Sequence, residues 1–210
     1  MPADAAPDES GILRTLMHKG RLEAFSDGVI AILITIMVLE LHQPEGDDLH
    51  ALQPLMPVFL TYILSFIFIG IYWNNHHHML QATKRINGAI LWANLHLLFW
   101  LSLIPFVTGW MGEHHSAALP NAAYAVVMLC CAIAYTILQR AIVKEQGSDS
   151  ALAKAVGSDR KGMMSLALYA GAIACAFVNQ WISDALLVTV ASIWLVPDRR
   201  IESTVHRQET

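Results

Sequence analysis

The chain has 210 residues, of which 55% are hydrophobic and only 14% are charged, and its formal net charge is −4. A soluble globular domain has about a quarter of its residues charged, so this composition excludes an ordinary soluble domain. We therefore expect a polytopic membrane protein whose surroundings are the lipid bilayer, with no nucleic-acid partner and no cofactor.

The first 20 residues are expected to form a disordered cytoplasmic tail. The opening stretch MPADAAPDESG is acidic and rich in proline and alanine. It lacks the charged segment followed by an apolar segment that is typical of a cleavable signal peptide. The first apolar span is therefore expected to act as its own uncleaved insertion signal.

Six apolar segments predict an all-α membrane protein with six transmembrane helices. A spanning helix needs roughly 20 predominantly apolar residues. The predicted spans are 23–42, 55–78, 88–111, 119–142, 162–181 and 183–197. The sixth is short, and residues of the polar turn before it are expected to complete the crossing. Together they define a transmembrane domain over residues 21–198, followed by a C-terminal tail over residues 199–210.

The basic residues predict the orientation of these spans. All 13 lysines and arginines precede the first span, follow the sixth, or lie in or beside the second and fourth connections. The three remaining connections contain none, and the first of them carries Glu45, Asp47 and Asp48 instead. Because basic loops stay in the cytoplasm, both termini and both tails are predicted to be cytoplasmic. The expected location is the cell membrane, as a multi-pass protein.

One carboxylate, Asp27, falls inside the first span. An ionisable group at such a position costs roughly 2.5–3.5 kcal/mol on insertion scales and usually has a partner or lines a wet cavity. The second span returns to the same depth at YWNNHHHM, residues 72–79. The residues expected to share this layer are Arg21, Asp27, Trp73, Asn74, Asn75, His76 and His77.

Two interpretations of this layer are open. It could be a hydrogen-bonded clamp between two helices, with either His76 or His77 meeting Asp27. It could instead be a titrating gate, since histidine changes charge near physiological pH. A metal site is not expected, because neighbouring residues on a helix point about 100° apart, so three consecutive histidines cannot face one ion.

A helical wheel separates Asp27 from an apolar stripe on the first span. With 100° per residue, Gly28, Ile32 and Leu39 fall on one narrow face together with Thr35 and Ile36. Asp27 lies nearly opposite that face. From spacing alone, the stripe fits packing against another helix as well as it fits a pore wall.

The stretch RLEAFSDGVIAILITIMVLEL resembles the RxxxFSD signature that opens the first helix of the transmembrane protein 175 family of potassium channels. The matching residues are Arg21, Phe25, Ser26 and Asp27. The WNNHH ending of the second span is also similar to the prokaryotic branch of that family. In that branch each subunit has one six-helix unit, which implies a homotetramer.

The resemblance implies that four first helices line a central pore. Its narrow part, an isoleucine one turn before a threonine, falls on Ile32 and Thr35, and further apolar rings fall on Ile36 and Leu39. The motif residues are implied to hold helices together through hydrogen bonds. That set, with its expected partners, is Arg21, Phe25, Ser26, Asp27, Trp73, Asn75, His76 and His77.

The implied activity is a potassium channel with modest preference for potassium over sodium, which passes other monovalent cations more weakly. The sequence has no TVGYG filter, so selection is expected at the Ile32 ring and the Thr35 hydroxyls. The chain is not expected to be an enzyme, because no nucleophile signature accompanies Asp27. The alternative is a secondary transporter of a cation or metal ion that uses the Asp27 and histidine cluster, which predicts interrupted helices near the membrane centre.

Overall fold

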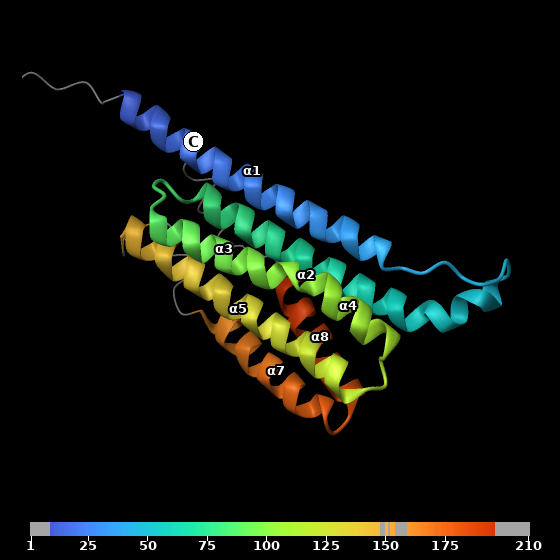
Figure 1. Cartoon of the computed structure of the whole chain (residues 1–210). Coiled ribbons are helices and arrows are strands. Elements are labelled where there is room, and N and C mark those ends of the chain that lie inside the picture. The colour runs from blue at the N-terminus through green and yellow to red at the C-terminus, as the bar shows by residue number, and fades with distance from the viewer. Residues whose placement is uncertain (1–8, 148–149, 151, 154–158, 196–210) are drawn as a thin grey trace, which may run out of the picture.

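The computed structural model describes residues 9–147, 150, 152–153 and 159–195. The expectations for residues 1–8, for Lys154 and for the C-terminal tail lie outside the described residues. Every secondary-structure element among the described residues is helical, which confirms the all-α class (Figure 1). In chain order the elements are α1 (Glu9–Leu39), the 3₁₀ helix η1 (Leu49–Leu55), α2 (Met56–Gln81), α3 (Gly88–Ser102), α4 (Ile104–Glu113), α5 (Ala118–Gln146), α7 (Arg160–Ala176) and α8 (Gln180–Leu195).

Helix α1 begins earlier than expected. It starts at Glu9 and has 31 residues, so residues 9–20 continue the first membrane helix and are not part of a disordered tail. The stretch from Glu9 to Gly20 contains no proline. Gly20 alone costs about 1 kcal/mol relative to alanine in a helix, which is too little to end a helix of this length.

Four helical stretches among the described residues are long and apolar enough to cross a membrane: 19–39, 49–81, 88–113 and 118–146. The last two predicted spans correspond to shorter helices, α7 with 17 residues and α8 with 16. The predicted apolar segments are therefore helical, and four of them reach spanning length by themselves.

The third predicted span is interrupted, whereas the sequence predicted one continuous helix over 88–111. It divides into α3 and α4 at Leu103, with Pro105 in the first turn of α4. Proline has no backbone N–H and therefore cannot donate to the carbonyl four residues earlier, Leu101. The missing hydrogen bond accounts for the break.

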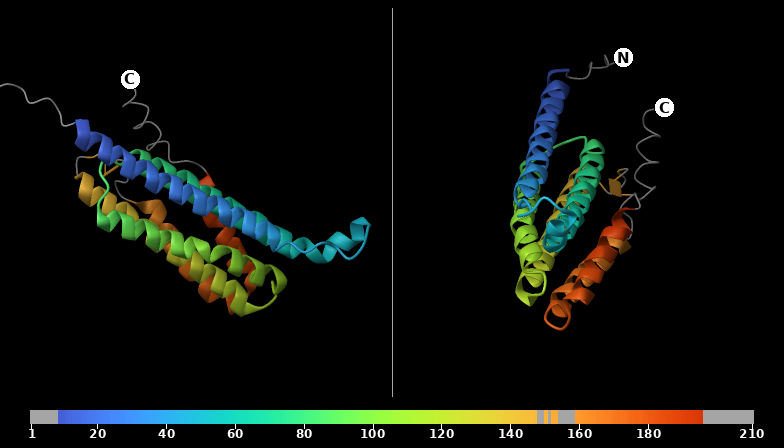
Figure 2. Two further views of the ribbon diagram at one scale, coloured as in Figure 1. Left: turned by 45° about the horizontal axis from the view of Figure 1, so that its top comes forward. Right: turned by 90° about the vertical axis from the view of Figure 1, so that its right-hand side faces the viewer.

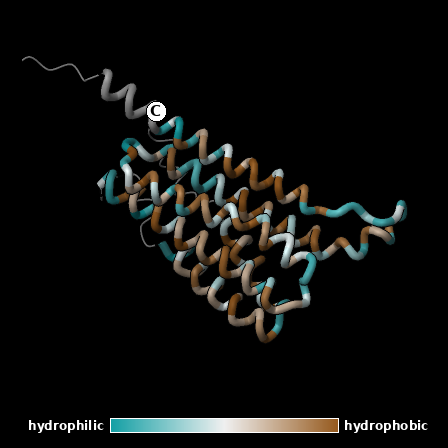
Figure 3. The backbone as a smooth tube through the Cα atoms, viewed as in Figure 1, coloured by the Kyte–Doolittle hydropathy of each residue, from teal (hydrophilic) through white to brown (hydrophobic). Residues whose placement is uncertain are grey.

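The helices form one bundle in which α1 lies along one edge and α7 lies on the opposite edge (Figures 1 and 2). Helix α5 packs against α3, α4, α7 and α8, whereas α1 packs against α2, α3 and α4. Fully buried apolar side chains such as Leu97, Ile104 and Met128 fill the interior. Hydrophilic residues gather at the two ends of the bundle, and apolar residues cover most of the helices between them (Figure 3).

Candidate functional site on the first helix

The face of α1 that packs on the bundle follows helical spacing. Leu22, Ser26, Ile30, Leu33 and Met37 are all buried and recur every three or four residues. Neighbours three and four apart lie on one side of a helix, so this row faces α2, α3 and α4. The side of α1 opposite this row is largely exposed within the described part of the subunit.

The opposite face of α1 is apolar and exposed. The exposed fraction is 57% for Ile32, 39% for Ile36 and 82% for Leu39. Gly28 and Thr35 are exposed on the same side of the helix. The structure therefore places the predicted stripe on a largely exposed side of α1, where Ile36 also borders a cavity against α4. A contiguous apolar surface of this kind marks a site of interaction with another molecule or with lipid.

Thr35 interrupts this apolar stripe with a hydroxyl whose orientation is fixed. Its Oγ1 donates to the carbonyl oxygen of Ile32 at 2.8 Å. Because the single hydroxyl proton is used within the helix, the two lone pairs of the oxygen remain available to the exposed side. This arrangement suits the coordination of a cation better than the donation of a hydrogen bond.

Asp27 is half-buried, and the hydrogen-bond donor to its carboxylate is the indole of a tryptophan and not the imidazole of a histidine. The Nε1 of Trp73 on α2 donates to Asp27 Oδ1 at 3.0 Å. The His77 ring stacks on Trp73, with ring centroids 5.8 Å apart and an interplanar angle of 21°. No hydrogen bond joins His76 or His77 to Asp27, so the expected direct pairing with one of these histidines is wrong.

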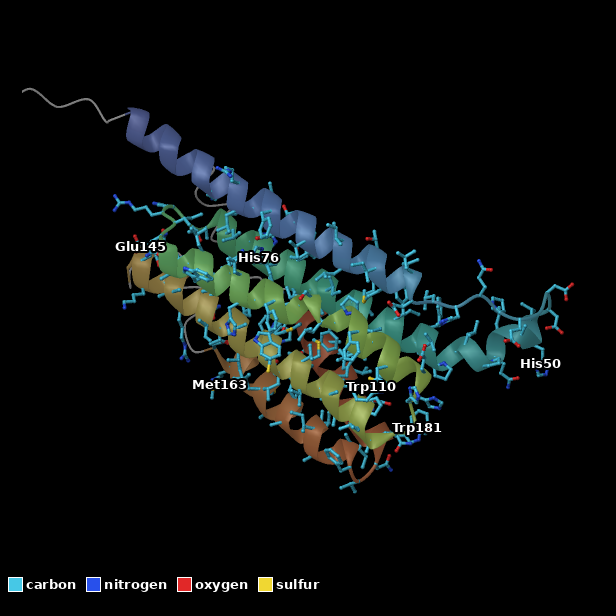
Figure 4. All side chains as sticks on the ribbon, viewed as in Figure 1. His50, His76, Trp110, Glu145, Met163 and Trp181 are labelled. Carbon is cyan, nitrogen blue, oxygen red and sulfur yellow. The ribbon has the colours of Figure 1, made fainter. Side chains whose placement is uncertain are left out.

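His76 belongs to a second, buried chain of hydrogen bonds. Its Nε2 donates to Asn94 Oδ1 at 2.7 Å, because an amide oxygen only accepts. Asn94 Nδ2 donates to Ser26 Oγ at 2.9 Å, and Ser26 Oγ donates to the carbonyl of Leu22 at 2.9 Å. All three side chains are buried, and the chain joins α2, α3 and α1 (His76 is labelled in Figure 4). Asn94 was not predicted, although an asparagine in the apolar stretch LWANLHLL was an available signal.

Four of the predicted motif and network residues take no part in these contacts between helices, and one of them, His77, stacks on Trp73 of its own helix. Asn75 Nδ2 donates to the carbonyl of Ile71 on its own helix at 2.8 Å. Arg21 and Phe25 are exposed, and Arg21 forms no ion pair with a described acidic residue. The clamp between helices therefore consists of the Trp73–Asp27 bond and the chain from His76 to Ser26.

A second series of buried hydrogen bonds, also unpredicted, joins the helices on which the packed face of α1 lies. Tyr124 on α5 and Ser65 on α2 have their hydroxyl oxygens 2.9 Å apart, and Ser65 lies 2.7 Å from Thr108 Oγ1 on α4. Thr108 donates to the carbonyl of Ile104 at 2.7 Å. Its oxygen also lies 4.0 Å from the sulfur of Met37 on the packed face of α1. These hydrogen bonds hold α2, α4 and α5 together on the side of the bundle that α1 packs against.

Acidic residues flank one end of the exposed stripe. A cavity of about 500 Å³ opens between α1 and the α3–α4 break and is lined by Ile36, Glu40, Phe106 and Glu113, among others. Glu113 Oε1 lies 3.9 Å from His42 Nδ1. The described residues contain no group of three His, Cys, Asp or Glu side chains that could hold a metal ion. The carboxylates of Glu40 and Glu113 make the lining of this cavity negatively charged at the end of the stripe.

Comparison with known proteins gives consistent similarities. Residues 21–105 match the sequence model of a family described as the endosomal/lysosomal potassium channel TMEM175. A potassium channel from Chryseobacterium sp. is 54% identical over 189 residues, which cover 90% of this chain and 98% of the relative. A potassium channel from Chamaesiphon minutus is 31% identical over 203 residues, covering 89% and 94% of the two chains.

A solved structure is similar over nearly the same extent. The crystal structure of a lysosomal potassium-selective channel TMEM175 homolog from Chamaesiphon minutus superposes with a TM-score of 0.73 at 29% identity. The match covers 87% of this chain and 98% of the solved chain. Both the sequence and the arrangement of helices are thus shared along almost the whole length.

Proposed function

The chain belongs to the TMEM175 family, and from this premise we propose that it is a potassium channel in which four copies arrange their α1 helices around one pore. The observation that carries the proposal is the exposed apolar stripe of α1, which the subunit itself leaves uncovered. Four such stripes facing a common axis bury that surface and enclose a narrow apolar path. The proposed location is the cell membrane.

In this proposal the chain crosses the bilayer six times and both termini are cytoplasmic. Helices α7 and α8 form the last two crossings. A helix of 16 residues is about 24 Å long, somewhat less than the roughly 30 Å hydrocarbon core. The flanking turns and local thinning of the bilayer can bridge a difference of this size. The one-sided distribution of lysines and arginines supports the same topology.

We place the constriction of the pore at Ile32 and Thr35. A ring of four isoleucine side chains excludes water when it is narrow and therefore blocks ions by dewetting. When the ring widens, an ion passes after losing part of its hydration shell, and potassium loses water more readily than sodium. The Thr35 oxygens, whose protons are held by the helix, replace part of that shell. Ile36 and Leu39 continue the apolar wall toward the acidic cavity.

The polar clamp has a positioning role in this mechanism. The bond from Trp73 to Asp27 and the chain from His76 through Asn94 to Ser26 attach α1 to α2 and α3. Because the Ser26 bond lies on the packed side of α1 and the Asp27 bond lies beside it, the two together fix the rotation of the helix about its own axis. That rotation decides which side chains face the pore.

The transporter alternative has one observation in its favour, the break between α3 and α4, since transporters bind substrates at interrupted helices. However, Leu103 at the break is nine residues beyond Asn94, which places it about 14 Å along the helix from the polar cluster. The interruption and the Asp27 and histidine cluster therefore do not form one site.

The proposed function is tested by reconstituting the purified protein in planar bilayers with opposed potassium and sodium gradients. A channel gives currents that do not saturate at low ion concentration, and its reversal potential follows the potassium gradient. A flux that saturates and requires a second, coupled ion would establish the transporter instead.

A further inference from the structure

A groove between α5 and the start of α7 lies away from α1 and plays no part in the proposed pore. Its volume is about 290 Å³, and its lining includes Gln139, Arg140 and Val143 of α5 and Met163 and Leu166 of α7. Met163, which is labelled in Figure 4, is 65% exposed. The groove thus has an open apolar side and a polar side.

The polar side contains groups that the described part of the protein leaves unpaired. Gln139 is only 9% exposed, yet its amide makes no hydrogen bond with a described residue. The Gln139 amide therefore opens onto the groove and is free to donate and accept hydrogen bonds with a ligand there. Arg140, the next residue, is exposed and forms no ion pair with any described acidic residue.

The charge at this end of the bundle is positive. Arg140, Lys144 and Arg160 are exposed, and no described carboxylate pairs with them. Two described acidic residues lie nearby, Glu145 and Asp159, and both accept hydrogen bonds. Glu145 Oε2 accepts from Asn87 Nδ2 at 2.6 Å, and Asp159, which lines the groove, accepts from the backbone N–H of Gly162 at 2.9 Å. Both carboxylates keep their negative charge, but Arg140, Lys144 and Arg160 outnumber them, so the excess charge of these residues is positive and favours an anionic ligand.

A smaller cavity of about 40 Å³ continues the groove inward, because Thr136, Asp159 and Gly162 line both. Tyr72 and Tyr169 also line it and are buried, and their hydroxyls make no hydrogen bond with a described residue. This volume is sufficient for a few water molecules, each needing about 10–15 Å³. Such waters would form hydrogen bonds with a ligand in the outer groove.

We propose that this groove binds the headgroup of an anionic phospholipid. The phosphate would lie against the Arg140 guanidinium and the Gln139 amide, and the acyl chains would run along Met163 and Leu166 into the bilayer. Basic pockets between transmembrane helices at the membrane surface are suited to anionic headgroups. The apolar wall beside the basic side chain favours a lipid over a soluble anion. The inference uses the membrane setting of the proposed function but not its pore.

The test is native mass spectrometry of the purified full chain with phosphatidylglycerol or phosphatidylcholine. Wild type is expected to retain phosphatidylglycerol in preference to phosphatidylcholine. Arg140→Gln should weaken phosphatidylglycerol binding by about fivefold, which corresponds to one basic side chain at an anionic surface. Gln139→Glu, which keeps the side-chain shape but adds negative charge, should weaken it too.

Lys144→Gln is the matched control, since it removes the same charge one turn further along α5 without altering the lining of the groove. It should bind as wild type does. Unchanged binding by Arg140→Gln would overturn the proposal, as would equal losses in Arg140→Gln and Lys144→Gln. Full displacement of the lipid by soluble glycerol phosphate would also overturn it, by showing a site for free anions. Because the readout is binding, failure here leaves the channel function untouched.

Discussion

The indole of Trp73 on α2 donates a hydrogen bond to the carboxylate of Asp27 on α1, with 3.0 Å between Nε1 and Oδ1. This bond satisfies an acidic group within a membrane helix by a neutral donor. It also leaves the opposite side of α1 free for the apolar stripe. The carboxylate is thereby a structural support of α1, and the ions are proposed to pass on the other side of the helix.

Trp73→Phe should destabilise the protein by about 1–2 kcal/mol, because it removes the donor to a charged group that is still partly solvated. In a protein that already carries Asp27→Asn, Trp73→Phe should destabilise the fold less than it does in the wild type, since the two residues share one bond. Thermal unfolding in detergent measures both effects. Trp92→Phe is the control, because Trp92 is an exposed tryptophan on α3 whose indole bonds to no described residue. Equal losses for the two tryptophans would contradict a specific role for the bond.

Ile32→Asn should increase the leak current and reduce the preference for potassium, because a polar side chain keeps the constriction wet. Reversal potentials in potassium and sodium gradients measure the preference. Ile182→Asn on α8 is the control, since Ile182 is similarly exposed and α8 does not pack against α1. If Ile32→Asn retained wild-type selectivity and closure, the constriction would have to lie elsewhere.

Thr35→Val should lower potassium conductance by roughly two- to tenfold, the effect of losing one hydrogen-bond-sized interaction of 0.5–1.5 kcal/mol. The reason is that valine has the shape of threonine but offers no oxygen to the ion. Thr35→Ser keeps the hydroxyl and should stay close to wild type. Single-channel recording distinguishes the two variants. Similar conductance in both would show that the hydroxyl does not contact ions.

Asn94→Leu should destabilise the protein by about 2–4 kcal/mol, because it leaves His76 and Ser26 without their buried partner. Asn75→Ala is the control, since the Asn75 amide bonds only to the carbonyl of Ile71 on its own helix. That variant should cost less than about 1 kcal/mol. Chemical or thermal unfolding monitored by circular dichroism gives the comparison. A small effect at Asn94 would mean that the chain from His76 to Ser26 contributes little to holding α1.

Combined Glu40→Gln and Glu113→Gln substitutions should reduce potassium current at low ionic strength and have little effect near 1 M salt. The two carboxylates raise the local cation concentration through a field that is screened within about 3 Å at 1 M. Current measured over a range of potassium chloride concentrations tests this. Glu145→Gln, at the far end of the bundle, should leave the current unchanged both at low ionic strength and near 1 M salt. A loss of current independent of salt would indicate a structural defect instead.

The sequence alone determined the all-helical class, the positions of the apolar segments and the separation of Asp27 from the stripe of Ile32, Thr35 and Leu39. These features depend on hydrophobicity and on the helical period of 3.6 residues, both of which are local properties of the chain. Even the break at Leu103 was accessible in principle, because Pro105 is visible in the sequence. The early start of α1 at Glu9 does not follow from hydrophobicity, because the proline-rich and acidic opening residues run directly into a stretch without proline that continues the helix.

Only the tertiary structure decided which polar groups meet. Asp27 bonds to Trp73 and not to a histidine, and His76 reaches Ser26 through Asn94 on a third helix. The chain of Tyr124, Ser65 and Thr108 joins residues up to 59 positions apart. Periodicity assigns a residue to a side of its own helix but not to a neighbouring helix. The partners depend on how the helices pack, which is set by the fit of many apolar side chains at once.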